Sequence, residues 1–414
     1  MVLARRDGTP DPYEPFSSDP AHGTTIAANL RRFTFGRRVV PIQGGTEIVL
    51  SRLTLAVALA ATCIATTLTA SGRSSTEPAH ASVANGAIVV DGKPFFPVML
   101  FDQCDSGAPK RAGSLGVNVI LNATCAAAGK DQLRSLASAQ LGVLPIGGRA
   151  VEGTRLLGWT YPDEPDNNGW SATGMATRFG YRRGNDDGHI SFVTTTSRFF
   201  TGPDPKGATA TAASFARVAD VAGFDLYPVN HCSTSLRGVY DAQRRFGRLA
   251  AGTPTFQWIE TGPIDSRYCG GVHLTPQEVT AEAWLAVAGG ARGVGFFTHT
   301  TYPTTSEFAV TPAVQQAIRR FSGIAAAIRP GLTGTTVAGT SDTPPVIALA
   351  RVAAGHTYVV AVNTLPSVVP AKLTVPRAAG HALNVVGENR KVAVFGGTFQ
   401  DTFTPLSVHV YETS

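Results

Sequence analysis

The sequence predicts an α/β fold, a (β/α)8 (TIM) barrel, followed by a small all-β sandwich-like domain. Between residues 97 and 330, eight apolar runs of strand length alternate with helix-like stretches. The runs are continuously apolar, as in parallel strands that are covered on both faces. Their alternation fills about 240 residues, close to the ~250 typical of such a barrel. A doubly wound open sheet is the alternative, but no Gly-rich nucleotide fingerprint follows the first strand.

The barrel elements are expected in the following order. A hairpin over residues 87–96 leads into the barrel or plugs its floor. The eight expected strands are residues 97–104, 117–124, 142–146, 156–161, 191–200, 224–229, 254–259 and 293–298. The expected helices are residues 110–115, 130–140, 208–222, 236–249 (a basic helix), 275–288 and 311–328.

Two stretches within this order have distinct local patterns. Thr275-Pro276-Gln277-Glu278 predicts a helix start, because it combines a Thr cap, a Pro at the first helical position and a Glu three residues after the cap. Residues 167–190 are polar and Gly-rich, and we expect an irregular connection there.

The pattern changes after Pro330-Gly331, so we divide the chain into a barrel at residues 85–330 and a second domain at residues 331–414. The second domain shows short strands separated by turn residues and no helical pattern, which is typical of a β-sandwich. Its expected strands are residues 346–352, 357–363, 371–375, 382–386, 392–395 and 406–411. We expect it to pack on the barrel; a carbohydrate-binding role is the alternative, although the domain contains no Trp.

The first 84 residues do not fit the barrel pattern. Residues 1–50 are rich in Pro, Arg, Gly and Ser and are expected to be disordered, or to precede the true start near Val49. Residues 51–84 combine a basic flank, an apolar run and small residues, as a signal peptide and linker do. The apolar run is short for a span of about 20 residues. We therefore predict a secreted or cell-surface bacterial protein, with membrane attachment only if residues 53–70 stay as an uncleaved anchor.

Export determines how the cysteines are interpreted. Cys63 would leave with the signal, and four cysteines remain in the exported chain. An even number in an exported chain permits disulfides. We expect Cys104–Cys125 and Cys232–Cys269, because each pair follows strand-like runs. Zinc is disfavoured, since no Cys-x-x-Cys or His cluster accompanies these residues.

The charge distribution disfavours a nucleic-acid partner. The formal net charge is +6, and no run of Lys and Arg with interleaved aromatic residues follows the N-terminal segment.

Two of the expected strands end in a glutamate. The fourth runs into Asp163-Glu164, and the seventh runs into Glu260. Every strand of such a barrel opens its carboxyl end on the same face, where the active site lies. Strands four and seven are three apart in the ring, so we expect the two glutamates to look across the mouth towards each other. Paired carboxylates of this kind cleave glycosidic bonds.

A barrel with these two glutamates and a trailing β-domain resembles clan A of the glycoside hydrolases. The resemblance implies that Glu164 is the general acid/base and Glu260 the nucleophile of a retaining mechanism, with carboxylates about 5–5.5 Å apart. It also implies that Tyr227, in Asp225-Leu226-Tyr227-Pro228, orients the nucleophile. Asp163 stands where the clan has Asn. An Asp there could accept a hydrogen bond from the sugar 2-hydroxyl, or raise the pKa of Glu164 through like-charge repulsion. Phe296-Phe297-Thr298-His299 stands where the clan has a stacking Trp.

Other residues are expected at the same face and are candidates for sugar binding. Asp102, Asn122 and His299 follow strands one, two and eight. Tyr161 and Trp258 belong to the two glutamate-bearing strands and are expected near the mouth.

The predicted function is therefore an exported glycoside hydrolase that acts on an oligo- or polysaccharide without a cofactor or metal. The alternative is a catalytically inactive barrel that binds glycans or a protein at the cell surface. A barrel lyase or metal-dependent hydrolase is a third possibility, but no His-x-His ligand cluster supports it.

Overall fold

The computed structural model describes residues 80–103, 105–122, 134–136, 139–146, 155–183, 188–202, 205–265, 269, 273–299 and 310–414. The predictions for the N-terminal 79 residues lie outside this part of the chain. Within it, no helix is long and apolar enough to cross a membrane.

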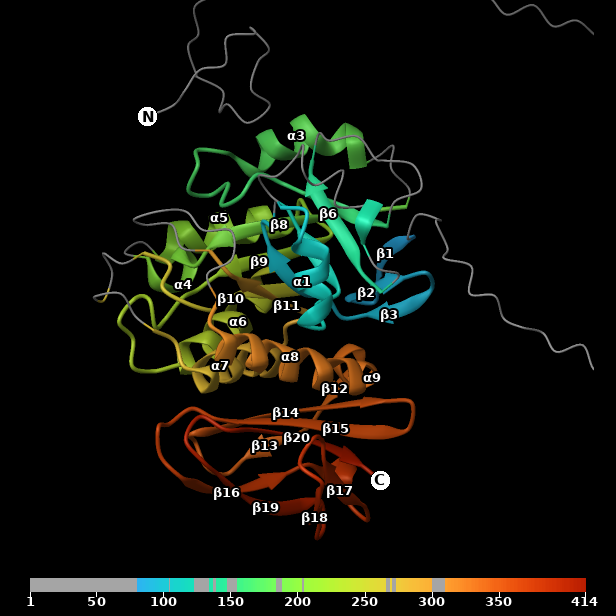
Figure 1. Ribbon diagram of the computed structural model, residues 1–414, viewed down its shortest axis with the longest axis vertical. Coiled ribbons are helices and arrows are strands. Elements are labelled where there is room, and N and C mark those ends of the chain that lie inside the picture. Colours follow the sequence, from blue (N-terminus) through green and yellow to red (C-terminus); the bar gives the residue numbers. More distant parts are fainter. Residues whose placement is uncertain are drawn as a thin grey trace, which may run out of the picture. The chain divides into compact units, whose positions relative to one another are not determined.

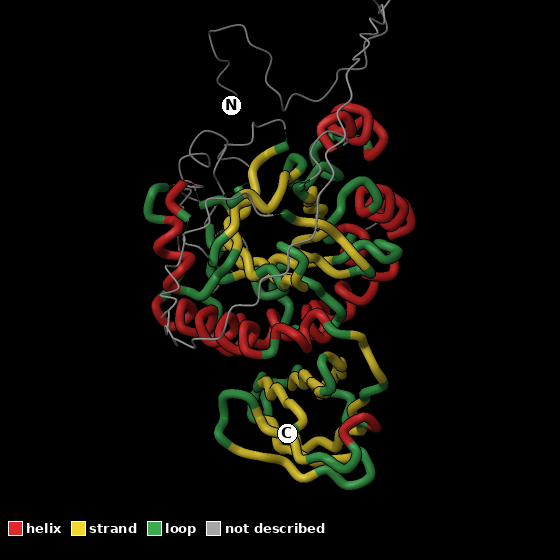
Figure 2. The backbone as a smooth tube through the Cα atoms, turned by 90° about the vertical axis from the view of Figure 1, so that its right-hand side faces the viewer, coloured by secondary structure: helices red, strands yellow, loops and turns green. Residues whose placement is uncertain are grey.

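Eight parallel strands close into a barrel, which confirms the predicted fold class (Figure 2). The ring follows the chain order. Its strands are β4 (Val98–Phe101), β5 (Val119–Leu121), β6 (Leu141–Pro145), β7 (Leu156–Thr160), β8 (Ile190–Thr196), β9 (Val221–Asp225), β10 (Thr255–Glu260) and β11 (Gly293–Phe297). β7 is therefore the fourth barrel strand and β10 the seventh, as the sequence predicted.

The predicted hairpin is part of a three-stranded antiparallel sheet of β1 (Ala81–Ala84), β2 (Ala87–Val90) and β3 (Lys93–Phe95). Its apolar side chains join the cluster that fills the barrel interior. The Ala81 N–H also donates to the Gly188 carbonyl, just before β8 begins, at 2.8 Å. The sheet therefore closes the amino-terminal end of the barrel and leaves the carboxyl end for the site.

Helices surround the barrel (Figures 1 and 2). They are α1 (Ala108–Ser114), α3 (Ala172–Arg183), α4 (Arg198–Thr201), α5 (Pro205–Ala216), α6 (Arg237–Leu249), α7 (Pro276–Ala288), α8 (Pro312–Ala327) and α9 (Arg329–Thr333). The capping box predicted at Thr275 and Glu278 is confirmed at the start of α7. Most of the helix predicted at 130–140 lies outside the described residues.

Three sequence predictions for the barrel were wrong. The strand expected at residues 191–200 ends at Thr196, and Arg198–Thr201 form the helix α4. The connection at 167–190 contains the helix α3, which is anchored by the buried Met175 and Phe179. The helix expected to run to residue 222 ends at Ala216, and β9 begins at Val221 rather than at residue 224. Gly223 belongs to this strand because the Phe256 ring occupies the space where a side chain would be; a Cβ there would lie 2.2 Å from a ring carbon.

The β-domain is a sandwich of two antiparallel sheets, ordered β12-β14-β15-β20-β17-β18 and β13-β16-β19. An apolar cluster fills the space between them. Three of its strands, β12, β13 and β19, were not predicted. The strands are β12 (Thr335–Val337), β13 (Thr340–Ser341), β14 (Val346–Ala353), β15 (His356–Asn363), β16 (Val369–Thr374), β17 (Ala382–Val385), β18 (Arg390–Ala393), β19 (Thr398–Phe403) and β20 (Val408–Thr413).

The barrel and the β-domain belong to one compact unit. A single apolar cluster extends from α7 and α8 to β15 and β20. Nine of the thirteen residues of α7 are buried, including Glu282. A helix that is buried on nearly every face lies inside a core, and α7 packs between the barrel strands and the larger β-sheet.

Candidate active site

Three carboxyl groups gather at the carboxyl end of the barrel. Asp163 and Glu164 follow β7, and Asp225 ends β9. The carboxyl groups of Asp225 and Glu164 are hydrogen-bonded to each other, although β7 and β9 are two strands apart in the ring. All three side chains are half-buried, so they remain open to a ligand.

The turn after β7 holds Glu164 in an unusual conformation. Its φ is +43°, in the left-handed region that a residue with a side chain occupies at a cost of about 1–3 kcal/mol. The surrounding turn enforces this conformation. Asn167 Nδ2 donates to Glu164 Oε2 at 3.1 Å, and Asn168 Nδ2 donates to the Asp163 carbonyl at 2.9 Å. Backbone strain that is held in this way is concentrated at functional sites.

Asp166 ties the same turn to the neighbouring strand. Its carboxylate accepts hydrogen bonds from the backbone N–H of Thr196 at 3.0 Å and from the Thr196 hydroxyl, at the end of β8. Asp166 therefore ties the turn that carries Glu164 to the end of β8.

Burial and crowding of the carboxyl groups raise their pKa values. The pKa of Asp163 rises to about 8, mainly through burial and then through the charges of Glu164 and Asp102. The pKa of Asp225 is raised well above its usual range, first by burial and then by the hydrogen bond to Glu164. The carboxyl whose pKa is raised keeps the proton, so Asp225 donates and Glu164 accepts. The cluster therefore contains protonated acids at neutral pH.

Glu260 lies deeper than the sequence predicted. It ends β10 as expected, but it is 0% exposed. Its Oε1 accepts from the Val229 N–H at 2.7 Å, and its Oε2 accepts from the Asn230 N–H at 2.9 Å and from Asn230 Nδ2. These donors all belong to the loop after β9. The Glu260 carboxylate therefore holds this loop in place.

A second buried glutamate lies against the first. Glu282 of α7 is fully buried, and burial followed by the charge of Glu260 raises its pKa well above the usual range. Two carboxylates cannot hydrogen-bond unless one is protonated, so Glu282 is the neutral donor to Glu260. The pKa of Glu260 is also raised by burial, but the hydrogen bonds from Asn230 and Val229 oppose that effect.

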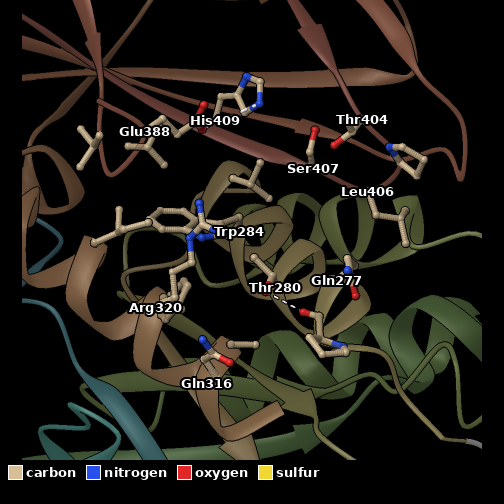
Figure 3. A pocket seen from close by; sticks show the side chains of 18 of the residues that line it. Gln277, Thr280, Trp284, Gln316, Arg320, Glu388, Thr404, Leu406, Ser407 and His409 are labelled. Atoms are coloured by element: carbon tan, nitrogen blue, oxygen red, sulfur yellow. Dashed lines mark hydrogen bonds and ion pairs between the residues drawn. The ribbon is translucent and has the colours of Figure 1, made fainter. Parts of the chain in front are cut away.

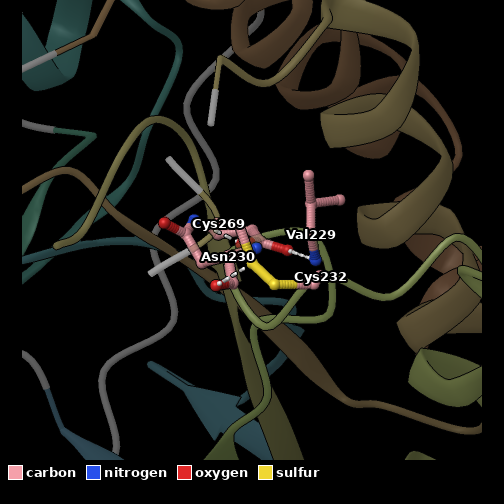
Figure 4. Close-up of a disulfide and its surroundings, with 5 residues drawn as sticks. Val229, Asn230, Cys232 and Cys269 are labelled. Atoms are coloured by element: carbon pink, nitrogen blue, oxygen red, sulfur yellow. Dashed lines mark hydrogen bonds between the residues drawn. A yellow bond between two sulfur atoms is a disulfide. The ribbon is translucent and has the colours of Figure 1, made fainter. Parts of the chain in front are cut away.

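A disulfide also restrains this loop. Cys232 in the loop after β9 is bonded to Cys269 in the loop after β10, with their Cα atoms 5.5 Å apart (Figure 4). The second predicted pair, Cys104 and Cys125, lies outside the described residues.

Aromatic side chains form one wall of the mouth. Tyr227 lies 5.5 Å from Phe297, and Phe297 lies 5.3 Å from Phe101 and 5.6 Å from His299, between ring centroids. His299 is tied to the end of β4, since its Nε2 lies 3.0 Å from the Phe101 carbonyl oxygen. Burial and then the charge of Asp225 raise the pKa of Tyr227 well above the usual range. Tyr227 is therefore a neutral hydroxyl beside the carboxyl cluster.

Two candidates for sugar binding belong to the core. Tyr161 is 1% exposed, its hydroxyl donates to the Val218 carbonyl at 3.2 Å, and its ring packs on Phe179 of α3. Trp258 is 1% exposed inside the barrel, where its indole N–H donates to Thr194 Oγ1 at 3.0 Å. We reassign both residues from sugar contact to core packing.

The remaining candidates lie at strand ends. Asp102, just after β4, is buried with φ +43°, and its charge contributes to the raised pKa of Asp163. Asn122 is buried just after β5, where its backbone N–H donates to the Val143 carbonyl.

Sequence reasoning missed three residues of the site. The sequence analysis gave Asp225 no role of its own, because the expected strand began at residue 224 and so did not end at Asp225. Asn230 and Glu282 had no sequence signal beyond their residue type: Asn230 follows a turn, and Glu282 lies within an apolar helix. Among the described residues, no group of three or more His, Cys, Asp or Glu side chains is arranged to hold a metal ion.

The fold is shared with solved structures of low sequence identity. An alpha-amylase from Geobacillus thermoleovorans, solved with acarbose, has 8% identity over 77% of this chain and 98% of its own, with a TM-score of 0.55. An alpha-amylase from Anoxybacillus has 8% identity over the same shares, with a TM-score of 0.52. A maltogenic alpha-amylase from Thermotoga neapolitana has 9% identity, again over 77% and 98%, with a TM-score of 0.50.

These likenesses show the fold. No protein-family model matches the sequence, and no curated protein matches it.

Proposed function

We propose that this protein is a glycoside hydrolase that cleaves O-glycosidic bonds of an oligo- or polysaccharide at the carboxyl end of the barrel. The observation that carries the proposal is the hydrogen-bonded Asp225–Glu164 carboxyl pair at the mouth. Cleavage of a glycosidic bond needs a carboxylic acid that is protonated near neutral pH, and a raised pKa supplies it.

The acid in this proposal is Glu164, with Asp225 as its proton source. The proton that Asp225 holds can pass along the hydrogen bond to Glu164, so the two groups act as one acid whose apparent pKa belongs to the pair. Glu164 then protonates the departing oxygen. Asp163, neutral below about pH 8, adds no negative charge beside the leaving group. Tyr227 offers a neutral hydroxyl to the sugar.

Glu260 is proposed as the nucleophile that attacks the anomeric carbon, followed by hydrolysis of the glycosyl-enzyme by water with Glu164 as base. Three N–H donors orient the Glu260 carboxylate and favour its ionised form. Because Glu260 is fully buried, this role requires its carboxylate to become accessible when the sugar binds. A carboxylate that serves only to hold that loop would leave attack to a water molecule, with inversion of configuration.

Activity against a panel of aryl glycosides tests the proposed function. Glu164→Gln should lower kcat on any accepted substrate by about 100-fold or more, since general acid–base catalysis is worth about 10²–10⁴. Glu412→Gln on the β-domain is the matched control, and it should leave kcat unchanged. Equal activity in the Glu164→Gln variant and the wild type would contradict the proposal. Binding of sugars without turnover in the wild type would favour the inactive glycan-binding barrel.

Covalent trapping separates the two possible roles of Glu260. A 2-deoxy-2-fluoro aryl glycoside of the accepted sugar should accumulate as a glycosyl-enzyme in a retaining hydrolase. Mass spectrometry of the digested protein should then find the sugar on the peptide that contains Glu260. Turnover of the parent substrate without any labelled peptide would show that Glu260 is a loop anchor and not the nucleophile.

Export is part of the proposal. It is supported by the signal-like pattern of residues 51–84 and by the Cys232–Cys269 disulfide, because disulfides persist in oxidising compartments. N-terminal sequencing of the native protein from the culture supernatant should find a start beyond residue 68. Recovery of the protein only from the cytoplasm, with its first residue retained, would contradict export.

A further inference from the structure

A cavity lies on the outer side of the barrel, where α7 and α8 meet the β-domain. Its volume is about 560 Å³, within the ~300–1,000 Å³ typical of small-molecule sites. Gln277, Thr280 and Trp284 of α7 line it, and their spacing of three and four residues places them on one face of that helix. Its other walls come from α8 and from the strands and turns of the β-domain (Figure 3).

The β-domain wall is held rigidly by an ionic network. Arg390 donates to Glu388 Oε2 at 2.8 Å and to both oxygens of Asp401, at 3.1 and 2.8 Å. His409 Nδ1 lies 2.9 Å from Asp401 Oδ2, and the Tyr411 hydroxyl donates to the same oxygen at 2.8 Å. Glu388 and His409 are the members of this network that line the cavity. Polar groups that are fixed before a ligand arrives reduce the entropic cost of binding it.

The barrel wall provides complementary hydrogen-bonding groups. Arg320 and Gln316 come from α8, across the cavity from Glu388 and His409, and Gln277 comes from α7 (Figure 3). Arg320 has no salt-bridge partner within the described part of the chain, so its guanidinium is available to a ligand. The primary amides of the two glutamines each offer donors and an acceptor.

The charges around the cavity balance. Arg320 and Arg390 carry positive charge, and Glu388 and Asp401 carry negative charge. A site for an anion would show an excess of cations. Balanced charges with alternating donors and acceptors suit a neutral ligand with many hydroxyl groups.

Part of the cavity lining is apolar. The rings of Trp284 and Phe321, which pack together with centroids 4.8 Å apart, line it, and so do Leu406 and Val408 of the β-domain. A lining that combines apolar and polar groups matches a sugar ring, which has C–H groups on its faces and hydroxyls around its edge.

We propose that this cavity, which we term the junction pocket, is a binding site for a short neutral oligosaccharide, separate from the mouth of the barrel. The site goes beyond the proposed hydrolysis, because it holds the sugar without cleaving it. It also gives the β-domain a role, since Glu388 and His409 supply one wall. The pocket would keep the enzyme on a polysaccharide while the mouth works on another stretch of it.

The test measures sugar binding by saturation-transfer NMR titration of the full chain with maltotriose, cellotriose, xylotriose and, as an anionic comparator, the trimer of galacturonic acid. Arg320→Ala removes the free guanidinium of the pocket. Arg319→Ala is the matched control, because Arg319 is also exposed on α8 but does not line the pocket. Glu164→Gln reports on the mouth.

At least one neutral trimer should bind the wild type and the Glu164→Gln variant alike. Arg320→Ala should weaken that binding by about tenfold or more, as expected for loss of a charged hydrogen bond, and Arg319→Ala should change it by less than about twofold. Equal affinity of Arg320→Ala and the wild type would place the sugar elsewhere and overturn the proposal. So would tighter binding of the galacturonate trimer, or no binding by any neutral trimer.

Discussion

Replacing Asp225 by Asn would separate the hydrogen bond at the barrel mouth from the proton that it carries. The Asn side chain has the same shape, and its amide can donate to Glu164 as the Asp225 carboxyl does. The turn that holds Glu164 depends on Asn167, Asn168 and Asp166, none of which the substitution touches. The variant should therefore fold normally and lose only the proton shared with Glu164.

The magnitude follows from the hydrogen bond. In the wild type, burial and the bond to Glu164 raise the pKa of Asp225, so the pair keeps its proton to higher pH than an isolated carboxyl would. Activity that needs this proton is lost as the pH rises. A hydrogen bond to a charged group is worth about 1.5–3 kcal/mol, and one pKa unit corresponds to about 1.4 kcal/mol. Asp225→Asn should therefore move the alkaline limb of kcat/KM down by about one to two pH units.

The assay is kcat/KM against pH from 4 to 10 on the best aryl glycoside, with circular dichroism to confirm folding. Asp220→Asn is the matched control, because Asp220 precedes the opposite end of β9. Asp220 Oδ2 accepts hydrogen bonds from the Ser191 N–H at 2.8 Å and from the Ser191 hydroxyl at 2.7 Å. The side-chain oxygen of an Asn can accept the same two hydrogen bonds. The control should leave the alkaline limb in place. A folded Asp225→Asn variant whose pH profile overlays that of the wild type would refute the shared proton.

Three further predictions concern stability. The pKa of Asp163 is raised to about 8, so its contribution to stability is present below pH 4 and is lost as the pH rises to about 8. Between pH 4 and 8 the unfolding free energy of the wild type should therefore fall by about 2–3 kcal/mol more than that of Asp163→Asn, after allowance for partial exposure, as measured by urea unfolding. Equal changes in both proteins would contradict this. Replacing both Cys232 and Cys269 by Ser should cost about 4 kcal/mol of unfolding free energy, from the 37-residue separation that the bond closes; an unchanged Tm would contradict this. Glu282→Gln should preserve the unfolding free energy at pH 7, because its amide can replace the neutral carboxyl as donor to Glu260. Glu282→Leu cannot donate and should lower the unfolding free energy by about 1–3 kcal/mol. Equal Tm values for the two variants would show that Glu282 makes no hydrogen bond to Glu260.

The sequence was sufficient for the parts of the fold that depend on burial alone. Parallel barrel strands are covered on both faces, so they appear as continuous apolar runs, and all eight were found. The order of these runs placed Glu164 after the fourth strand and Glu260 on the seventh. The start of α7 was equally readable, because the capping box is a local signal whose partners lie three residues apart.

The sequence could not predict the bounds of β9, because they depend on how this strand packs against the neighbouring strand β10. The apolar residues among 218–222 have a spacing that suits either a helix or a strand, and the Phe256 ring against Gly223 favours the strand. That choice moves the end of β9 from residue 229 to Asp225. It also turns Asp225 from an unremarked neighbour of Tyr227 into the partner of Glu164.

The direction of Tyr161 was unpredictable for a related reason. β6 pairs Gly142 with Leu156 and then Val143 with Gly158, so the register shifts by one residue at this point. A shift of one residue sends the side chains that follow to the opposite face. Leu157 accordingly packs inside the barrel, whereas Tyr161 packs outside it. No pattern in the sequence shows such a shift.

The loop after β9 connects these findings. It is held by the Glu260 carboxylate at Val229 and Asn230, and by the disulfide at Cys232. The ring of Tyr227 against Phe297 holds the chain just after Asp225. These restraints fix the end of β9, and a fixed strand end keeps Asp225 within reach of Glu164. Glu260 therefore has a part in the site whether or not it attacks the sugar: its buried charge sets the position of the loop that presents the carboxyl pair.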